Sequence, residues 1–488
     1  MSLKRKIAYN TAAQIVGRAV NTVISIVAIG ILTRYLGVAG FGNYTTVFAF
    51  VGLFSTFADF GFMLILLREL GAKKVSPEKA AGNVLSIRTI FALVVYALCF
   101  AVGWLLDYPL VVNLGIGIIA LSMLWGTIQG TVVAVLQANL KADRAVLGDV
   151  ASRLTTLGLI ILFSRLQYGL LALLSAYPVG AFVGLVINTF YANQCVKLRF
   201  KFDKQYWRYL WQQSWPVGLA SILAIVYFKI DSVMLSVMKT QVDIGIYGAP
   251  YKIYEVLLAL PALFIGIIFP IMSGYLAQKK LEKFCGAMQK SFDFMMLLSV
   301  PLMVGAITLA RPIINIVAGS EFIRTSTFSI AGYPMTAVST LQVLAVTIIL
   351  TYLTSIFNNM IIAAGKQRAL LLPNLCFMLL NIVLNLLLIP RFSYIGAAVA
   401  TIITELCVLL VNRHLLHNFI DFRLNGSASA KAIVGGIIMA LAILPLRNTF
   451  IVLPMLVGSL VYFVVVVATK AVSKEMLREI IKGETKAS

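Results

Sequence analysis

Long apolar runs alternate with short polar joints along the whole chain. A bilayer core about 30 Å thick needs around 20 apolar residues for one spanning helix, and bounding each run by charges or turn residues gives about fourteen spans. They are expected near residues 8–33, 41–67, 83–106, 109–137, 146–164, 169–193, 215–237, 244–275, 290–310, 333–363, 370–390, 395–418, 431–447 and 449–470. The pattern predicts an all-α, polytopic membrane protein.

Composition supports this pattern and excludes a soluble globular protein. Of the 488 residues, 60% are hydrophobic and only 12% are charged, whereas about a quarter of the residues of a typical soluble protein are charged. The mean hydropathy of +0.95 corresponds to more apolar surface than a soluble core can bury.

The formal net charge of +22 is an orientation signal and does not indicate a nucleic-acid partner. If Lys4, Arg5 and Lys6 are cytoplasmic, the inner loops and tails hold about 28 of the 40 Lys and Arg residues, and the outer loops hold seven. Basic residues concentrate on the cytoplasmic side of membrane proteins. We therefore expect a multi-pass protein of the plasma (inner) membrane with both termini cytoplasmic.

The chain repeats itself at two places. The run Phe41-Gly-Asn-Tyr44 at the head of the second span has a counterpart in Ile244-Gly-Ile-Tyr247 at the head of the eighth. The stretch 141–169 is echoed by the stretch 366–396. These matches place spans 1–6 over spans 7–12 in the same order and orientation, which is the parallel repeat of a transporter whose halves rock about a central site.

The repeat predicts three parts of the chain. They are an N-terminal lobe of residues 1–213, a C-terminal lobe of residues 214–425, and a segment of residues 426–488 with two further spans and a cytoplasmic tail.

The sequence contains no motif for nucleotide hydrolysis, a disulfide framework or a metal site. There is no GxxxxGK[ST] motif and no cytoplasmic loop long enough for a nucleotide-binding domain, so hydrolysis of ATP by a P-loop mechanism is excluded. The five cysteines lie singly in or beside apolar segments, which predicts neither a disulfide framework nor a metal site. We expect no cofactor, no metal and no catalytic residue.

Basic residues inside the spans are candidates for binding an anionic substrate, because a buried charge is costly and usually faces a wet cavity. They are Arg18, Arg88, Arg153, Lys229 and Lys252. Arg88 lies near a helix end and is equally well explained as an interface anchor. Arg153 follows Asp149 by four residues, so a pair within the helix is the competing interpretation. Arg18 and Lys229 have no such partner on their own helix.

Polar residues, most of them uncharged, form stripes at helical spacing in three spans. The first stripe consists of Asn10, Gln14, Arg18, Asn21 and Ser25. Span 10 carries Thr347, Thr351, Thr354 and Asn358, and span 11 carries Asn374, Asn381 and Asn385. Such faces either contact substrate or hydrogen-bond between packed helices, and for Gln14, Asn358, Asn381 and Asn385 both interpretations stay open.

Carboxylates inside the spans are candidates for coupling to protons or cations, since burial can bring their titration into a useful range. They include Asp59, Asp231, Glu255 and Glu405, and Lys252 lies three residues before Glu255. Structural ion pairing between helices is the alternative. About six carboxylates against five bases leave the membrane interior nearly neutral, so an anion site depends on how the charges are grouped.

Motifs in a fixed order give the chain a family resemblance. The run Thr33-Arg-Tyr-Leu-Gly37, then Phe41 to Tyr44, Asp59-Phe-Gly61 and Arg68-Glu69, continues through Asp231, Gly245, Pro261 and Pro270 to Gly396 and Glu405. Over roughly residues 5–410 the sequence resembles the polysaccharide transporter family (Wzx-like oligosaccharide flippases). Its superfamily, the multidrug/oligosaccharidyl-lipid/polysaccharide exporters, also holds the lipid II flippases and the multidrug and toxin extruders.

The resemblance implies a flippase that moves a polyprenyl-pyrophosphate-linked oligosaccharide from the cytoplasmic to the outer leaflet by alternating access, driven by a gradient or the membrane potential. It implies a cavity lined partly by cations, for which the matching positions are Arg18, Arg34, Arg88, Arg153, Lys229 and Lys252. Asp59, Asp231 and Glu255 match coupling positions. The implied partners are the lipid-linked oligosaccharide, membrane lipid and a glycan polymerase or ligase, and we expect a monomer.

Two alternatives remain at this stage. A multidrug or metabolite cation antiporter of the same superfamily would depend on Asp231 or Glu255 and would need no lipid-linked sugar. A membrane enzyme of glycan assembly would be expected to carry a sizeable aqueous loop with clustered carboxylates or histidines, and the short loops argue against it.

Overall fold

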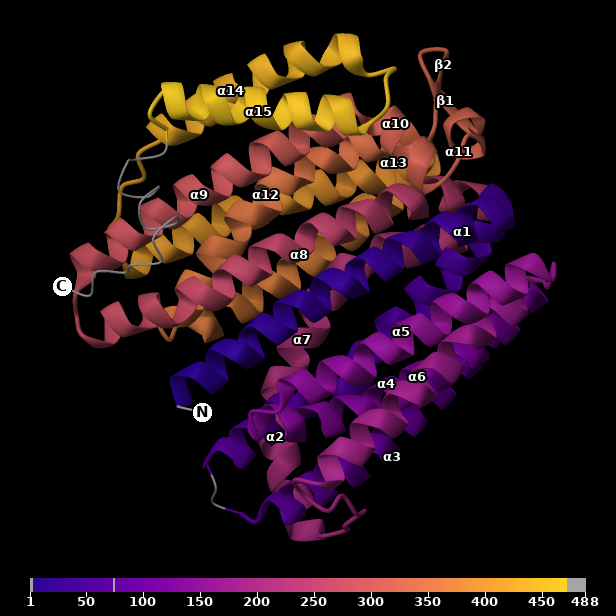
Figure 1. Ribbon diagram of the computed structural model, residues 1–488, viewed down its shortest axis with the longest axis vertical. Helices are drawn as coiled ribbons and strands as arrows, with labels where there is room; N and C mark the ends of the chain where they lie inside the picture. Colours follow the sequence, from indigo (N-terminus) through magenta and orange to yellow (C-terminus); the bar gives the residue numbers. More distant parts are fainter. Residues whose placement is uncertain (1–2, 73–74, 472–488) are drawn as a thin grey trace. The chain divides into compact units, whose positions relative to one another are not determined.

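The computed structural model describes residues 3–72 and 75–471 and is almost entirely helical (Figure 1). The helices are α1 (Leu3–Asp59), α2 (Phe62–Ala72), α3 (Pro77–Leu105), α4 (Leu110–Ala138), α5 (Ala142–Arg165), α6 (Leu170–Asn193), α7 (Lys204–Met238), α8 (Gln241–Ala277), α9 (Leu281–Thr308), α10 (Ala310–Val317), α11 (Glu321–Arg324), α12 (Ala337–Ala363), α13 (Leu371–Phe419), α14 (Ser427–Ile443) and α15 (Val452–Ala468), with short 3₁₀ turns at Gln367–Leu370 and Leu444–Leu446. The strands are β1 (Phe328–Ile330) and β2 (Tyr333–Met335). The predicted cytoplasmic tail beyond residue 471 lies outside the described residues.

The helices of the structure lie largely where the hydropathy pattern predicted membrane spans. Among the described residues, ten helical stretches are long and apolar enough to cross a membrane. Two long helices each cover two expected spans: α1 is broken at Gly37 (φ 64°) and α13 at Ser393 (φ 47°). The all-helical membrane fold is therefore as predicted, while the number of fourteen spans stays a prediction.

Polar caps fix where several helices begin. The Ser76 side chain accepts from the backbone N–H of Lys79, and Pro77 takes the first position of α3. Asp203 caps α7, and Thr336 forms a capping box with Ser339 at the start of α12. Each cap satisfies backbone N–H groups that have no partner inside the helix.

The backbone repeats at the turns where the sequence repeats. Leu140 and Gly365, each directly before the lysine of its repeat, have φ values of 54° and 71°. Gln167 and Ser393, each two residues after the arginine of its repeat, have φ values of 57° and 47°. Matching left-handed residues therefore end corresponding helices at both turns.

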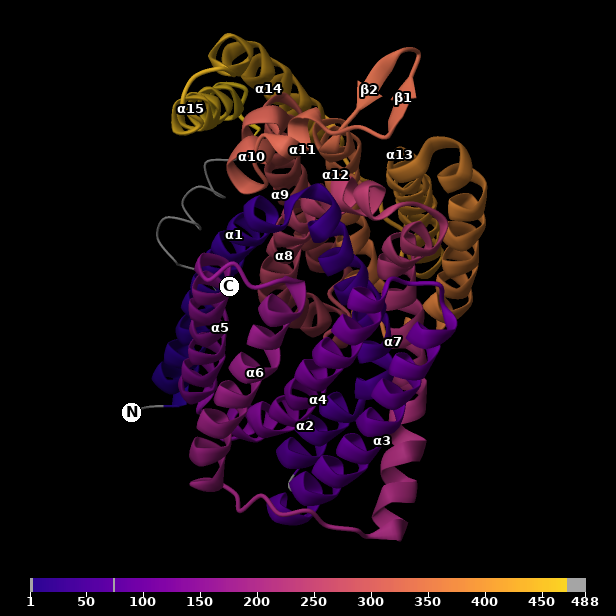
Figure 2. The ribbon, with the colours of Figure 1, turned by 90° about the vertical axis from the view of Figure 1, so that its right-hand side faces the viewer.

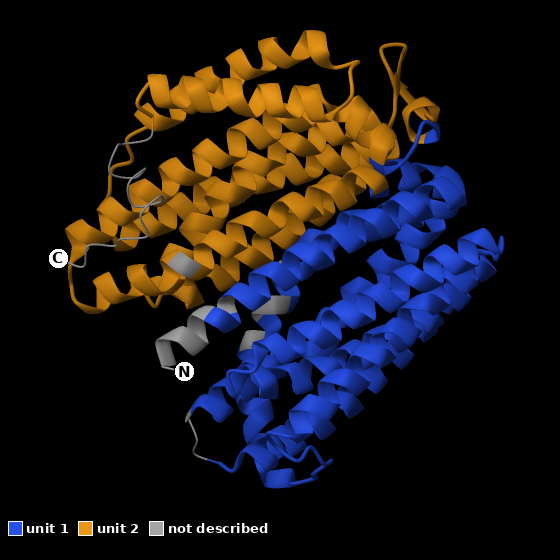
Figure 3. Ribbon diagram, in the orientation of Figure 1, with its two compact units in different colours: residues 1–248, 317–321 blue, residues 249–316, 322–488 orange. Residues whose placement is uncertain are grey.

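The chain divides into two compact units (Figure 3): residues 1–248 with 317–321, and residues 249–316 with 322–488. Unit 1 extends beyond the expected lobe 1–213 because α7 packs on α1, α2 and α3. The lobes defined by the repeat remain a prediction.

In unit 1, α6 lies between α4 and α5 and contacts both (Figure 2), and α1 packs on α4 and α5. A hydrophobic core fills the space between α2, α3, α4 and α7, with Phe62, Leu66, Ala81, Val135 and Leu210 among its buried side chains. This packing holds the polar groups of the neighbouring helices at fixed distances.

In unit 2, α12 packs on α9 and α13, and α14 and α15 form a pair of helices against α9. The antiparallel hairpin β1–β2 pairs Phe328 with Met335 and Ile330 with Tyr333. The sequence predicted a span that begins at residue 333; the helix begins at Ala337 because the apolar residues 333–335 form a strand.

Candidate functional site

A buried arginine connects three helices of unit 1. Asp59 ends the helical part of α1, because Phe60 and Gly61 take positive φ values of 41° and 77° before α2 begins. Arg88 of α3 forms an ion pair with the Asp59 carboxylate and donates a hydrogen bond to Thr131 Oγ1 of α4 at 3.0 Å. The structure thus pairs two residues for which the sequence suggested separate roles.

The two partners differ in burial. The Arg88 side chain is 6% exposed, whereas the Asp59 side chain is 40% exposed, where exposed means open to lipid or water. A buried guanidinium without its carboxylate would be a buried uncompensated charge, which is strongly destabilising. Arg88 is therefore more than an anchor at the membrane surface, and the accessible side of the pair belongs to Asp59.

A second polar cluster surrounds Asp149 on α5. Its carboxylate accepts hydrogen bonds from Gln129 Nε2 of α4 at 2.8 Å and from Asn188 Nδ2 of α6 at 3.5 Å. Arg153, which the sequence suggested as a partner within the helix, interacts with Asp149 only through space and donates its hydrogen bond to Ser25 Oγ of α1 at 3.2 Å. Amide groups from neighbouring helices thus hold Asp149, and Arg153 is directed toward α1.

The polar stripe on α1 faces α5 and the turn before it. Asn10 donates to the carbonyl of Leu140 at 2.9 Å and accepts from the N–H of Ala142 at 2.7 Å. Ser25, at the other end of the stripe, accepts the bond from Arg153. The stripe ends therefore serve helix packing, while Gln14 between them is half-buried and Arg18 is exposed.

Asp231 on α7 is 2% exposed, and it accepts hydrogen bonds from the Tyr247 hydroxyl of α8 and from the N–H of Ser232. Lys229, two residues earlier and on another face, is half-buried. Arg34 on α1 is exposed and donates to the carbonyl of Gly30 at 2.9 Å. Asp231 is thus held between α7 and α8 within unit 1.

In unit 2, Lys252 and Glu255 of α8 form an ion pair of 2.8 Å, and their side chains are 23% and 28% exposed. The sequence noted their spacing and assigned them to substrate and to coupling; the structure brings these two together. Asn358 on α12 is half-buried.

Of the asparagine stripe on α13, Asn381 and Asn385 are buried, and Asn374 is half-buried. Asn385 donates to the carbonyl and to the side-chain oxygen of Asn381 at 2.9 and 3.0 Å, and Asn381 donates to Thr404 Oγ1 at 3.3 Å. These contacts join the two halves of α13, as the packing interpretation of the stripe predicts.

Sequence reasoning missed the groups that hold the charges. Gln129 and Thr131 lie in an uncharged part of α4, and Asn188 lies in α6, which contains no charged residue, so no charge in either helix marked them. Glu69, which is 6% exposed and accepts from the Tyr209 hydroxyl at 2.8 Å, was visible only as part of a family motif. Within the described part of the chain, no cluster of His, Cys, Asp or Glu has the geometry of a metal site.

Comparison with known proteins identifies the family to which the chain is similar. A family of polysaccharide biosynthesis proteins matches residues 3–276. The chain is 24% identical to the probable low-salt glycan biosynthesis flippase Agl15 of Haloferax volcanii over 420 residues, which cover 86% of this chain and 85% of that protein. It is 22% identical to the putative O-antigen transporter of Shigella flexneri over 415 residues, covering 80% and 93% of the two chains.

Solved structures show the same fold. The lipid II flippase MurJ in an inward closed conformation matches with a TM-score of 0.76 and 15% identity, over 96% of this chain and 99% of that one. An inward-facing multidrug resistance MATE transporter matches with a TM-score of 0.66 and 12% identity, over 82% and 95%. The resemblance drawn from the sequence motifs is confirmed, and the chain belongs to the polysaccharide biosynthesis protein family.

Proposed function

We propose that this protein is a flippase that carries a polyprenyl-pyrophosphate-linked oligosaccharide from the cytoplasmic to the outer leaflet by alternating access. The observation that carries this proposal is that relatives over 80% or more of the chain are named a probable glycan biosynthesis flippase and a putative O-antigen transporter. The fold shared with a lipid II flippase supports it. The protein is accordingly a transporter and not an enzyme.

The arrangement of charges in unit 1 supports a pyrophosphate site on α1 and α5. Arg88 is neutralised by Asp59, whereas Arg18 and Arg153 have no ion-pair partner in the described residues and are both exposed. Arg153 bonds to Ser25, and Arg18 lies seven residues before Ser25 on the same helix, which is about 10 Å at 1.5 Å per residue. Arg18 and Arg153 therefore present two cations on neighbouring faces of α1 and α5.

The other assigned residues complete the proposal. Gln14, Arg34, Lys229 and Asn358 remain candidates for sugar contacts, and Asp59, Asp231 and Glu255 for coupling to a proton or cation. For Asn381 and Asn385 their burial and mutual hydrogen bonds favour the packing role over a sugar contact. The plasma membrane, cytoplasmic termini, monomeric state and a glycan polymerase or ligase as partner belong to the same proposal.

The direct test is translocation of a defined polyprenyl-pyrophosphate oligosaccharide in vesicles that contain the purified protein, with and without an imposed potential or pH gradient. The proposal expects movement that the gradient accelerates. Movement with no response would indicate a flux-driven scramblase, and no movement with several sugars would refute the proposal.

Substitutions test the residue assignment. Arg18→Gln with Arg153→Gln should abolish most of the movement, because two charge-assisted contacts with the pyrophosphate are lost. Arg165→Gln is the matched control, since Arg165 is also exposed and also lies on α5, at its far end. Equal loss in both variants would remove the assignment of Arg18 and Arg153.

A cation antiporter is the second candidate, and the fold shared with a multidrug transporter favours it. It expects cells that produce the protein to survive organic cations, and it expects that protection to disappear in Asp231→Asn or Glu255→Gln variants. Protection without any movement of lipid-linked sugar would replace the first proposal with this one.

A further inference from the structure

The segment between α6 and α7 carries a concentration of cations and aromatic rings. Lys197, Arg199, Lys204 and Arg208 are exposed. Beside them, Phe200 and Phe202 are 56% and 66% exposed. We call these six residues the basic-aromatic surface.

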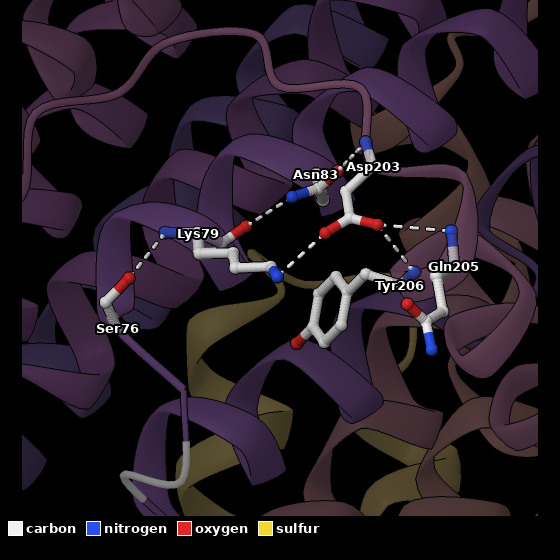
Figure 4. A network of polar contacts seen from close by, with 6 residues as sticks. All are labelled: Ser76, Lys79, Asn83, Asp203, Gln205 and Tyr206. Carbon is white, nitrogen blue, oxygen red and sulfur yellow. Dashed lines mark hydrogen bonds and ion pairs between the residues drawn. The ribbon is translucent and has the colours of Figure 1, made fainter.

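The basic-aromatic surface is held rigidly against α3 (Figure 4). The N–H of Lys201 donates to Ser86 Oγ at 3.0 Å, and the N–H of Asp203 donates to Asn83 Oδ1 at 2.8 Å. The Lys79 ammonium lies 2.7 Å from the Asp203 carboxylate, which also caps α7 through the N–H groups of Gln205 and Tyr206.

The close approach of the segment requires a glycine on α3. A Cβ at Gly82 would lie 2.4 Å from the carbonyl oxygen of Arg199, so a side chain at this position would push the segment away. This close approach, the polar contacts with α3 and the packing of Val196 and Leu198 on the core fix the segment, whereas its two phenylalanine rings are not part of that core. Rings that a rigid loop holds outward at the end of a helix have the position of an interfacial aromatic belt.

The charge of the surface is uncompensated. The only acid among residues 194–215 is Asp203, and Lys79 and two backbone amides already engage it. Within the described residues, none of the four exposed cations has an ion-pair partner. A surface with four cations and two apolar rings matches an anionic lipid interface, because headgroups meet the cations while the rings enter the acyl boundary.

We propose that the basic-aromatic surface binds anionic glycerophospholipid headgroups of the adjacent leaflet. Each basic residue near an anionic membrane surface favours binding by about a factor of five, so the four together enrich anionic lipid strongly at this site. Trp207, Trp211 and Trp215 lie on α7, the helix that also carries Lys204 and Arg208. They serve as reporters, since Trp211 and Trp215 are 43% and 50% exposed.

The experiment measures quenching of tryptophan fluorescence by brominated lipids in vesicles. The chain has five tryptophans, and the variant W104F/W125F leaves only the three on α7. It is reconstituted in phosphatidylcholine with a minor fraction of either brominated phosphatidylglycerol or brominated phosphatidylcholine. The proposal expects severalfold stronger quenching by the brominated phosphatidylglycerol, and this excess should fall at high salt because the interaction is screened.

Two further variants decide whether the named cations cause the excess. Replacing Lys197, Arg199, Lys204 and Arg208 by Gln in the same background should remove the excess while quenching by brominated phosphatidylcholine stays unchanged, which also shows that the protein is folded and inserted. Lys279→Gln with Lys280→Gln, at the exposed turn before α9, should keep the excess. Equal quenching by the two lipids, or an excess that survives the four substitutions, would overturn the proposal. These readouts do not require transport.

Discussion

Two glycines permit α1 and the first turn of α8 to cross with their backbones in contact. A Cβ at Gly42 would lie 1.7 Å from the carbonyl oxygen of Gln241, and a Cβ at Gly245 would lie 2.0 Å from the carbonyl oxygen of Val38. Gly245 follows Gly42 by 203 residues, and Gln241 follows Val38 by the same 203. The contact is therefore reciprocal, as expected where two repeat-related helices cross, and Gly42→Ala should destabilise it.

The expected loss of stability follows from how close the added Cβ would come to the carbonyl oxygen of Gln241. Real Cβ contacts are essentially never shorter than 3.0 Å, so alanine at position 42 must separate the two helices by more than 1 Å. Overpacking costs about 1–3 kcal/mol where neighbours can adjust, and here the neighbour is a backbone carbonyl. We expect Gly42→Ala to cost about 3 kcal/mol of unfolding free energy, and the bond from Thr46 Oγ1 to Gln241 Oε1 at 3.1 Å would be lost with it.

Gly52→Ala is the matched control, because Gly52 lies on the same helix and nothing lies within 4 Å of its Cβ position. Alanine should be neutral or stabilising there, by about 0.5–1 kcal/mol. The double variant Gly42→Ala/Gly245→Ala should cost clearly less than the sum of the two single variants, since one separation of the helices relieves both clashes.

The assay is the thermal midpoint of the purified protein in detergent, followed by the fraction that stays monodisperse after heating. If Gly42→Ala unfolded at the same temperature as Gly52→Ala, the crossing would not be as tight as the distances state. If the double variant lost the full sum, the two contacts would not share one crossing.

Three further predictions concern charges and topology. Asp59→Asn should lower the free energy of unfolding by about 2–3 kcal/mol, because it leaves the charge of Arg88 buried without its partner. Glu255→Gln should lower it by less than about 1 kcal/mol, because the Lys252–Glu255 pair is partly exposed. Thermal melting of the two variants measures this difference. The hydrogen bond from Lys79 and those from the N–H groups of Tyr206 and Gln205 hold the pKa of Asp203 below its ordinary value. The stabilisation from Asp203 should therefore be present at neutral pH and disappear as the pH falls through that lowered pKa, so the melting curves of wild type and Asp203→Asn should differ at pH 7 and converge in acid. In a cysteine-free background, Gln167→Cys should react with an impermeant maleimide added outside, and Lys279→Cys, also exposed, only after permeabilisation; the reverse pattern would contradict the predicted orientation.

The helices could be predicted because membrane spans are long and apolar, but single-residue breaks could not. The gaps between expected spans at residues 34–40 and 391–394 contain the breaks at Gly37 and Ser393. The break at Phe60 and Gly61 was missed, since a change in φ leaves hydropathy unaltered. The strand Tyr333–Met335 was missed because its residues continue the apolar pattern of the following helix.

The candidate residues could be predicted from polarity inside spans, whereas their partners could not. Lys252 and Glu255 are three residues apart, so helical spacing alone made their contact visible. Arg153 and Ser25 lie 128 residues apart, and Arg88 and Asp59 lie 29 apart on different helices. Such contacts depend on how α1, α3 and α5 pack, and a single sequence contains no signal for that packing.

The pairing explains how a nearly neutral membrane interior is compatible with an anion site. Two of the five basic residues inside the spans, Arg88 and Lys252, are held by carboxylates of the same compact unit. A carboxylate that neutralises its neighbour does not repel a phosphate bound elsewhere, because the field of a close pair falls off faster than that of a single charge. Asp149 accepts its hydrogen bonds from amides, and Arg153, which acts on it only through space, directs its guanidinium to Ser25. The balance of charge over the whole membrane interior is thus a poor measure of its affinity for anions, and the proposed pyrophosphate site on α1 and α5 depends instead on how Arg18 and Arg153 are grouped.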